Sequence, residues 1–217
     1  MTSETYFQQI KERLEQINEI IDAKAQKQVT LVGVTKGLTH EEVNIANELG
    51  IKNFGENYAQ ELLMKSSLVD PKISWHFIGQ LQSNKIRKIS HLVDVWHSVT
   101  SLKLAREIHK RNDQAKILLQ VSLRGPSNSK GFEVDQLPQL ISELRDKNID
   151  ISGLMTMGVP GDVIATRVVF EKLRKLADTF ELPECSMGMS DDFEIALESG
   201  ASIIRVGSAI FGNRRPD

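Results

Sequence analysis

The chain has 217 residues, of which 40% are hydrophobic and 26% are charged, as in an ordinary soluble globular protein. The formal net charge of -2, with no block of like charges, gives no electrostatic basis for binding nucleic acid or an anionic membrane. Cys185 is the single cysteine, which excludes an internal disulfide and is consistent with a reducing compartment. We find no signal peptide and no segment that is long and apolar enough to span a bilayer, so we expect a cytoplasmic protein.

Helices and strands are predicted to alternate along the whole chain. Residues 6–21 come first and are typical of an amphipathic helix, because apolar residues recur there at three- and four-residue steps. Apolar runs then predict strands at residues 31–36, 51–55, 73–78, 92–99, 116–123, 149–155, 183–187 and 202–206. Helices are predicted at residues 39–49, 58–63, 86–89, 101–110, 137–144, 169–180 and 191–199, with a short one after Gly207. Residues 39–42 have the form of a capping box, and residues 124–131 are a predicted loop.

This alternation predicts an α/β fold, because strands separated by helical crossovers pair in parallel. The apolar strands favour a closed (β/α)8 TIM barrel, formed as a single domain over residues 1–217. The helix before the first strand is expected to cap the bottom of the barrel. An open doubly wound sheet is the alternative, and it is disfavoured because no Gly-x-Gly-x-x-Gly follows any strand.

Lys36 stands at the carboxyl end of the first predicted strand. Because side chains alternate along a strand, Lys36 is predicted to share a face with Val32 and Val34. An ammonium group at an apolar wall loses hydration, which favours the neutral amine, and such an amine can condense with an aldehyde to give a Schiff base. The alternative is a lysine that marks the exit of the strand into solvent, and the segment taken alone favours this alternative.

Barrel enzymes carry their sites at the carboxyl ends of the strands. Polar residues and glycines follow the predicted strands of this chain, and together they predict a ring of polar groups around one mouth. Its members are Lys36, Asn57, His76, His97, Ser122 and residues 155–157, 186–190 and 205–208. We interpret His76 and His97 as core residues, because they lie beside tryptophans on apolar strands.

Other common chemistries find no support. The histidines show no spacing typical of a zinc site, and no Cys/His cluster exists, so we expect no metal. No Gly-x-Ser-x-Gly elbow is present, so acyl transfer by a serine has no support. We interpret Cys185 as a small buried hydrophobe rather than a nucleophile.

The last predicted strand and the short helix after it carry the best anion-binding signal. Gly207 lets the backbone approach a ligand closely, and Ser208 opens a helical turn whose N–H groups can bind phosphate. Gly188 and Ser190 follow the previous strand and are positioned to complete a phosphate cup. Asp191 and Asp192 would repel a phosphate, so we expect both to point outward and to complement the dipole of their own helix. The alternative for residues 207–208 is an ordinary tight turn.

Arg205 shares a predicted face with Ile203 and Gly207, so it is expected to point where Lys36 points. A buried guanidinium stays charged and needs a partner. That partner is either an acidic side chain of the barrel or a bound cofactor, and the residues alone weigh these alternatives equally. Donation from an arginine to a pyridine nitrogen would leave the ring unprotonated and make it a poorer electron sink.

Several motifs resemble the pyridoxal phosphate homeostasis proteins, a family named for a bacterial homologue co-transcribed with proline synthetase. The matching segments span nearly the whole chain in the order of the family: VTK at 34–36, FGENYAQE at 54–61, WHFIGQLQSNK at 75–85, SKG at 129–131, GLM at 153–155, MGMSDD at 187–192 and RVGSAIFG at 205–212. The segments 75–85 and 188–192 are highly specific.

The resemblance implies a barrel like the amino-terminal domain of alanine racemase, of PLP fold type III, that holds pyridoxal 5′-phosphate (PLP). The residues that match the site of the family are Lys36 as the Schiff-base lysine, Arg205 facing the pyridine nitrogen, Ser190, Gly207 and Ser208 in the phosphate cup, and Asn57 and Met155 near the ring. One departure is visible: Leu38 stands where the family usually has a proline, which is expected to loosen the loop after Lys36.

The resemblance also implies a function in intracellular PLP homeostasis, in which the protein buffers or delivers the cofactor without strong catalytic turnover. The alternatives are a PLP-dependent amino-acid racemase and a phosphosugar aldolase with a Schiff-base lysine. Racemisation needs a second acid/base group and a site for the substrate carboxylate, which the racemases obtain partly from an all-β domain and a dimer partner. We therefore expect negligible racemisation. The uninterrupted single barrel favours a monomer, and the open mouth suggests that apo-enzymes dock there and receive the cofactor directly.

Overall fold

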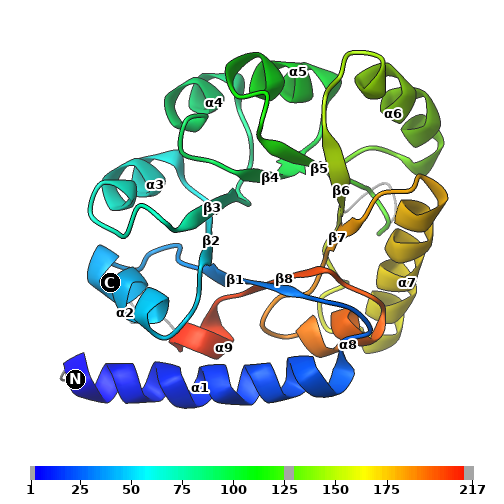
Figure 1. Cartoon of the computed structure of the whole chain (residues 1–217). Coiled ribbons are helices and arrows are strands. Elements are labelled where there is room, and N and C mark those ends of the chain that lie inside the picture. The colour runs from blue at the N-terminus through cyan, green and yellow to red at the C-terminus, as the bar shows by residue number, and fades with distance from the viewer. Residues whose placement is uncertain (1–2, 125–129, 213–217) are drawn as a thin grey trace.

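The computed structural model describes residues 3–124 and 130–212 and contains a closed barrel of parallel strands in sequence order (Figure 1). The strands are β1 (Thr30–Val34), β2 (Asn53–Glu56), β3 (Ser74–Phe77), β4 (Val95–Val99), β5 (Lys116–Gln120), β6 (Ile151–Met155), β7 (Glu184–Ser186) and β8 (Ile203–Val206). β1 pairs with both β2 and β8, which closes the sheet. The predicted (β/α)8 barrel is confirmed, and the open sheet is excluded.

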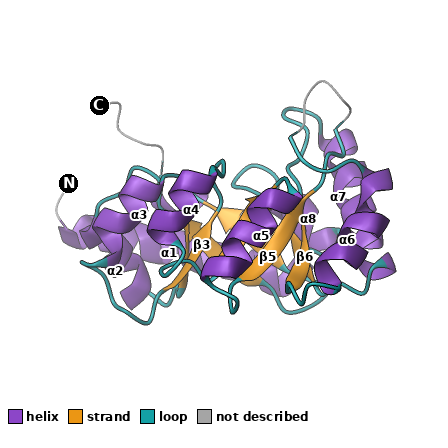
Figure 2. Cartoon of the chain, turned by 90° about the horizontal axis from the view of Figure 1, so that it is seen from above, coloured by secondary structure: helices purple, strands orange, loops and turns teal. Residues whose placement is uncertain are grey.

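Helices surround the barrel, and none of the described helices crosses either end (Figure 2). They are α1 (Ser3–Lys24), α2 (His40–Glu48), α3 (Ala59–Ser66), α4 (Ser83–Ile89), α5 (Leu102–Arg111), α6 (Leu137–Arg145) after the 3-10 turn η1 (Val134–Gln136), α7 (Val163–Thr179), α8 (Phe193–Glu198) and α9 (Ser208–Phe211). None of the described helices is long and apolar enough to cross a membrane.

Local sequence signals explain several helix boundaries. α2 begins with a complete capping box, in which Thr39 Oγ1 accepts from the Glu42 N–H and Glu42 accepts from the Thr39 N–H. α7 begins six residues before the predicted helix, because Asp162 caps it by accepting from the Ala165 N–H at 2.9 Å. Part of the predicted loop at 124–131 lies outside the described residues.

Apolar side chains fill two separate layers. Inside the barrel, Val32, Val95, Leu118, Met155 and Ile203 form a small cluster. A much larger cluster lies between the strands and the surrounding helices. Successive side chains of each strand therefore point in turn into the inner and the outer apolar layer. This is why the strands appear in the sequence as continuous apolar runs.

The prediction that the first helix caps the bottom of the barrel is wrong. α1 instead lies on the flank of the barrel, against α2, α8 and α9 (Figure 1). Its buried residues Ile10, Leu14 and Ile17 pack into the outer apolar layer. α8 and α9 are short helices of six and four residues, so α1 supplies the apolar cover that they cannot give to this side of the barrel.

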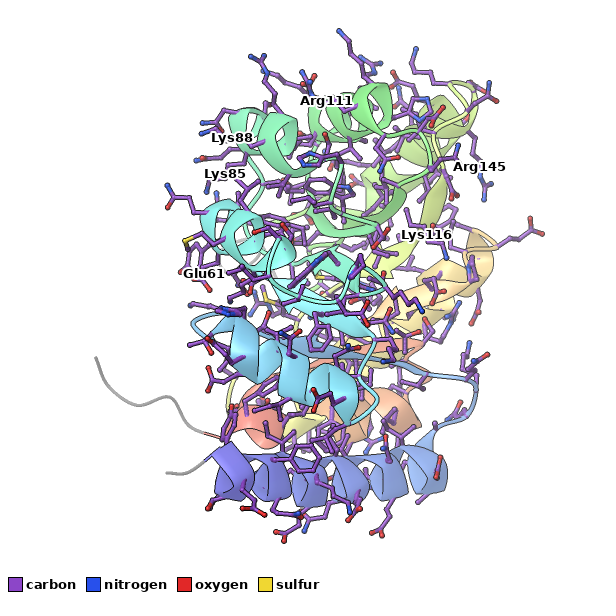
Figure 3. The ribbon with its side chains drawn as sticks, turned by 60° about the vertical axis from the view of Figure 1, so that its left-hand side comes forward. Glu61, Lys85, Lys88, Arg111, Lys116 and Arg145 are labelled. Carbon is purple, nitrogen blue, oxygen red and sulfur yellow. The ribbon has the colours of Figure 1, made fainter. Side chains whose placement is uncertain are left out.

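The amino-terminal end of the barrel is consequently open. A cavity of about 350 Å³ lies there, lined by residues at or near the starts of the strands, including Thr30, Asn53, Ser74, Lys116 and Glu184. Figure 3 shows Lys116 at this end of the molecule, whereas Glu61 and Lys85 lie at the other end.

Candidate functional site

Lys36 lies two residues beyond β1, in the turn that leaves the carboxyl end of the barrel. The strand therefore ends earlier than predicted, and Lys36 does not continue its alternation of faces. The side chain is half-buried, and its Nζ lies 5.2 Å from the centroid of the Tyr58 ring. Lys36 is thus held against an aromatic surface at the mouth of the barrel rather than extended into solvent.

A buried ionic network holds the turn that carries Lys36, and sequence reasoning missed it. Lys65 Nζ donates to Glu56 Oε1 at 2.5 Å, to the Thr35 carbonyl at 2.7 Å and to Glu61 Oε2 at 3.0 Å. Thr35 Oγ1 also donates to Glu56 Oε1 at 2.7 Å. Burial raises the pKa of Glu56, and the Lys65 charge opposes that shift.

The loop after Lys36 is tied by backbone hydrogen bonds. Gly37 donates its N–H to Glu61 Oε2 at 2.7 Å, and Leu38 donates its N–H to the Thr35 carbonyl at 2.9 Å. A proline at position 38 has no N–H for the second bond. The leucine therefore contributes a bond to the turn that a proline could not make, and the expected loosening of the loop stays a prediction. The one sign of the buried ionic network in the sequence was the spacing of Glu61 and Lys65, which stand four residues apart on a helix.

Arg205 lies inside the barrel, beside Val32 of β1 and below the level of Lys36. The residue is 4% exposed, and its guanidinium donates to Ser186 Oγ and, at 3.2 Å, to the Thr156 carbonyl. No carboxylate in the described part of the chain forms an ion pair with it. Burial lowers the pKa of Arg205 to about 10, and the Asp192 charge opposes that shift. Arg205 therefore forms no ion pair with the first of its two predicted partners, an acidic side chain of the barrel.

His76 and His97 are buried in the barrel interior, as predicted for core residues. The prediction that His76 belongs to the ring at the mouth is wrong, because it lines the cavity at the amino-terminal end. His76 Nδ1 lies 2.8 Å from His97 Nε2, and His97 Nδ1 lies 2.8 Å from Ser186 Oγ. Burial lowers the pKa of His76 to about 4 and lowers the pKa of His97 well below its ordinary value. Both imidazoles are therefore neutral at pH 7 and serve as hydrogen-bonding groups of the core.

The predicted phosphate cup is assembled from the segments after β7 and β8. Ser190 Oγ accepts from the N–H groups of Gly207 at 3.1 Å and Ala209 at 3.3 Å. Ser208 is exposed beside them, as the first residue of α9. Gly188 has a φ of +91°, and a Cβ there would lie 2.6 Å from Ala196 Cβ, so only glycine fits. The structure therefore brings Ser190, Gly207 and Ser208 together.

The prediction for the two aspartates is correct only for Asp191, which is exposed. Asp192 is half-buried, makes no side-chain cap to α8, and accepts from the Met189 N–H at 2.6 Å. A Cβ on Gly158 would lie 2.2 Å from its Oδ2, so the carboxylate fills the space that this glycine leaves. Burial raises the pKa of Asp192. The turn after β7 captures the side chain, and this prevents it from pointing outward.

The remaining predicted residues lie at the same end of the barrel. Asn57 follows β2 and is half-buried, and its Oδ1 has no hydrogen-bond partner among the described residues. Met155 is the last residue of β6 and belongs to the interior cluster. In the motif at 129–131, Ser129 lies outside the described residues, whereas Lys130 Nζ donates to Gln80 Oε1 at 3.0 Å. Two motifs distant in the chain therefore meet at the mouth.

The prediction for Cys185 agrees with the structure. Cys185 is buried, and burial raises its pKa to about 12, so it is an inert core residue. The described residues contain no cluster of His, Cys, Asp and Glu that could hold a metal ion. The mouth thus carries a lysine, a buried arginine and a serine–glycine cup, and these cationic and N–H groups suit an anionic ligand.

These features define the class of protein: a (β/α)8 barrel of the alanine racemase type, with a lysine and an arginine at the carboxyl end. The alanine racemase of Corynebacterium glutamicum shares this fold with a TM-score of 0.72 at 14% identity, over 94% of this chain and 60% of that protein. No family model matches the chain. Because it is 38% identical to the Pyridoxal phosphate homeostasis protein of Aquifex aeolicus, the chain belongs to the pyridoxal phosphate homeostasis protein family.

Two comparisons carry this assignment. The Pyridoxal phosphate homeostasis protein of Aquifex aeolicus is 38% identical over 201 residues, which cover 85% of this chain and 87% of that protein. The structure of PipY of Synechococcus elongatus with PLP bound has a TM-score of 0.83 at 31% identity, over 94% of this chain and 100% of that protein.

Proposed function

We propose that this protein binds PLP at the carboxyl-end mouth of the barrel, holds it as a Schiff base on Lys36, and buffers or delivers it in the cell. The observation that carries the proposal is Arg205: a buried cation with no ion-paired carboxylate among the described residues, lying below Lys36 at the same mouth. The Asp192 charge acts on this guanidinium without forming an ion pair with it. A nearby phosphate dianion would add negative charge, and a ring nitrogen would accept an N–H of the guanidinium.

The residues present fit this cofactor. Ser190 Oγ accepts from the Gly207 and Ala209 N–H groups, so its own hydroxyl hydrogen is left to donate to a phosphate, and Ser208 lies exposed beside it at the start of α9. Arg205 keeps its proton and donates to an acceptor nitrogen, so the ring stays neutral. The partnerless Asn57 Oδ1 and the apolar Met155 are suited to the edge and face of a planar ring. When bound, PLP supplies an aldehyde that condenses reversibly with an amine.

We propose a carrier rather than a catalyst. A neutral ring is a poor electron sink, so the arginine disfavours carbanion chemistry. None of the described helices crosses the mouth (Figure 2), so we expect water to reach a ligand bound there. In this proposal a monomeric, cytoplasmic domain over residues 1–217 gives PLP directly to docked apo-enzymes. Deuterium exchange at Cα of alanine in D2O tests this, and rapid exchange would favour the racemase.

The decisive experiment is an absorbance spectrum of the purified protein with PLP, before and after borohydride, followed by mass analysis of the labelled peptide. We expect a band typical of an imine that borohydride removes, and a label on Lys36. Lys172, an exposed lysine on α7, is the matched control site that should remain unlabelled. An unchanged PLP spectrum would refute the proposal and leave the aldolase alternative.

A further inference from the structure

A chain of hydrogen bonds crosses the barrel interior from Arg205 to its amino-terminal end. It runs from Arg205 through Ser186, His97 and His76 to Asn53, and we call its last four residues the interior chain. The two central contacts are 2.8 Å each, and the last, between His76 Nε2 and Asn53 Oδ1, is 3.3 Å. Ser186 and His97 are fully buried, so no solvent competes with these bonds.

The groups at the two ends give the interior chain one direction. A guanidinium can only donate, so Ser186 Oγ accepts from Arg205. The single O–H of Ser186 is buried and needs an acceptor, which His97 Nδ1 provides. His97 then donates from Nε2 to His76 Nδ1.

The far end agrees with this direction. His76 donates from Nε2 to Asn53 Oδ1, which can only accept. Each bond then has one donor and one acceptor, with both imidazoles neutral and protonated on Nε2. The depressed pKa values of the two histidines are consistent with this neutral state.

We propose that the interior chain is a positioning device for Arg205. By holding the Ser186 proton toward His97, it keeps a lone pair of Ser186 facing the guanidinium and fixes the plane of that group. The Thr156 carbonyl accepts a second N–H from the other terminal nitrogen. The guanidinium is thereby oriented before a ligand arrives, and this lowers the entropic cost of donating to a ring nitrogen. The inference rests on the proposed function, because that function assigns the ring nitrogen to Arg205.

The first test needs no cofactor. Nitrogen-15 chemical shifts of the histidine rings in the cofactor-free protein report the tautomers directly. We expect His97 and His76 both to be neutral and protonated on Nε2. A proton on His97 Nδ1 would reverse the chain and overturn the proposal, whether or not the protein binds PLP.

The second test measures PLP affinity and the absorbance band of the loaded protein. Ser186→Ala and His97→Phe should each weaken binding about tenfold, as expected for a lost hydrogen bond to a charged group, and should shift the band. His97→Gln keeps a donor and an acceptor and should restore part of both. Ile108→Ala is the control: it opens a cavity in the outer layer and should lower stability without changing affinity or band.

The outcomes separate this inference from the proposed function. If the wild-type protein fails to bind PLP, the proposed function fails, and the tautomers still decide the direction of the chain. If wild-type protein binds and Ser186→Ala changes neither affinity nor band, the positioning role is overturned. Should His97→Phe fail to fold, Ser186→Ala and the tautomer measurement still decide.

Discussion

Lys65 Nζ lies 2.7 Å from the carbonyl oxygen of Thr35, the residue immediately before Lys36. The same ammonium group neutralises the buried Glu56, so one lysine stabilises the turn that presents another. The lysine at the mouth is half-buried on an aromatic ring, whereas the supporting lysine is 6% exposed and fully committed to hydrogen bonds. The division of roles between Lys36 and Lys65 leads to the first two predictions.

Lys36→Ala should abolish the borohydride-stable attachment of PLP and leave the protein folded. Its Nζ lies over the Tyr58 ring in a cation–π interaction worth about 0.5–1 kcal/mol, so little stability depends on the lysine. Urea unfolding and mass analysis after borohydride provide the measurements. Lys36→Arg keeps the charge without a condensing amine and is the matched control. Unfolding of Lys36→Ala on its own would mean that this lysine is structural.

Lys65→Met should destabilise the protein by about 3–5 kcal/mol, because it leaves Glu56 buried without its cation. Urea unfolding at pH 7 measures this loss. The exposed Lys172→Met should change stability by less than about 0.5 kcal/mol. Adding Glu56→Gln to Lys65→Met should recover part of the lost unfolding free energy. A double variant that is no more stable than Lys65→Met would contradict the claim that the unpaired Glu56 charge causes the loss.

Stability should fall as pH decreases from 6.5 toward 4. His76 has a folded pKa of about 4 against 6.5 in the unfolded chain, because burial disfavours its cation and Lys116 adds to that effect. The unfolded chain therefore binds a proton first, and the stability that is present above pH 6.5 is lost as pH falls through this window, by on the order of 3 kcal/mol. Urea midpoints at several pH values should show a smaller slope for His76→Gln, and an identical slope would exclude His76 as the source.

Gly188→Ala should destabilise the protein and weaken PLP binding. The new Cβ would lie 2.6 Å from Ala196 Cβ at a φ of +91°, so the turn before Ser190 has to shift. Gly161→Ala is the matched control, because its φ is +75° and nothing lies within 4 Å of its Cβ. We expect a loss of about 1 kcal/mol at Gly161 and a clearly larger one at Gly188. Thermal unfolding and a PLP titration measure the two effects, and equal losses would exclude the steric argument.

The sequence was most informative where the signal is local. The capping box of α2, the alternation of strands and helices, and the burial of His76 and Cys185 all follow from neighbouring residues and apolar patterning. The resemblance assigned roles to Lys36 and Arg205, and the structure places both at the predicted end of the barrel.

The parts that could not be predicted depend on contacts between distant segments. His97 and Ser186 are 89 positions apart, and only closure of the barrel brings them together. Asp192 reads as a helix-capping residue until the turn after β7 offers it the Met189 N–H. An apolar face on α1 is consistent with a position at the bottom of the barrel or on its flank. The flank is left short of apolar cover because α8 and α9 are short, and this cannot be read from the sequence of α1.

The position of α1 on the flank has a consequence for how the molecule is made. Arg13 of α1 donates to the Ile210 carbonyl of α9, a contact between residues 197 positions apart. β1 likewise needs β8 as its neighbour. During synthesis, α1 and β1 therefore cannot make these contacts until α9 and β8 have been translated. The helix α9, which bears Ser208, packs against α1 only after the barrel has closed. We therefore expect a phosphate ligand to bind only after the barrel has closed.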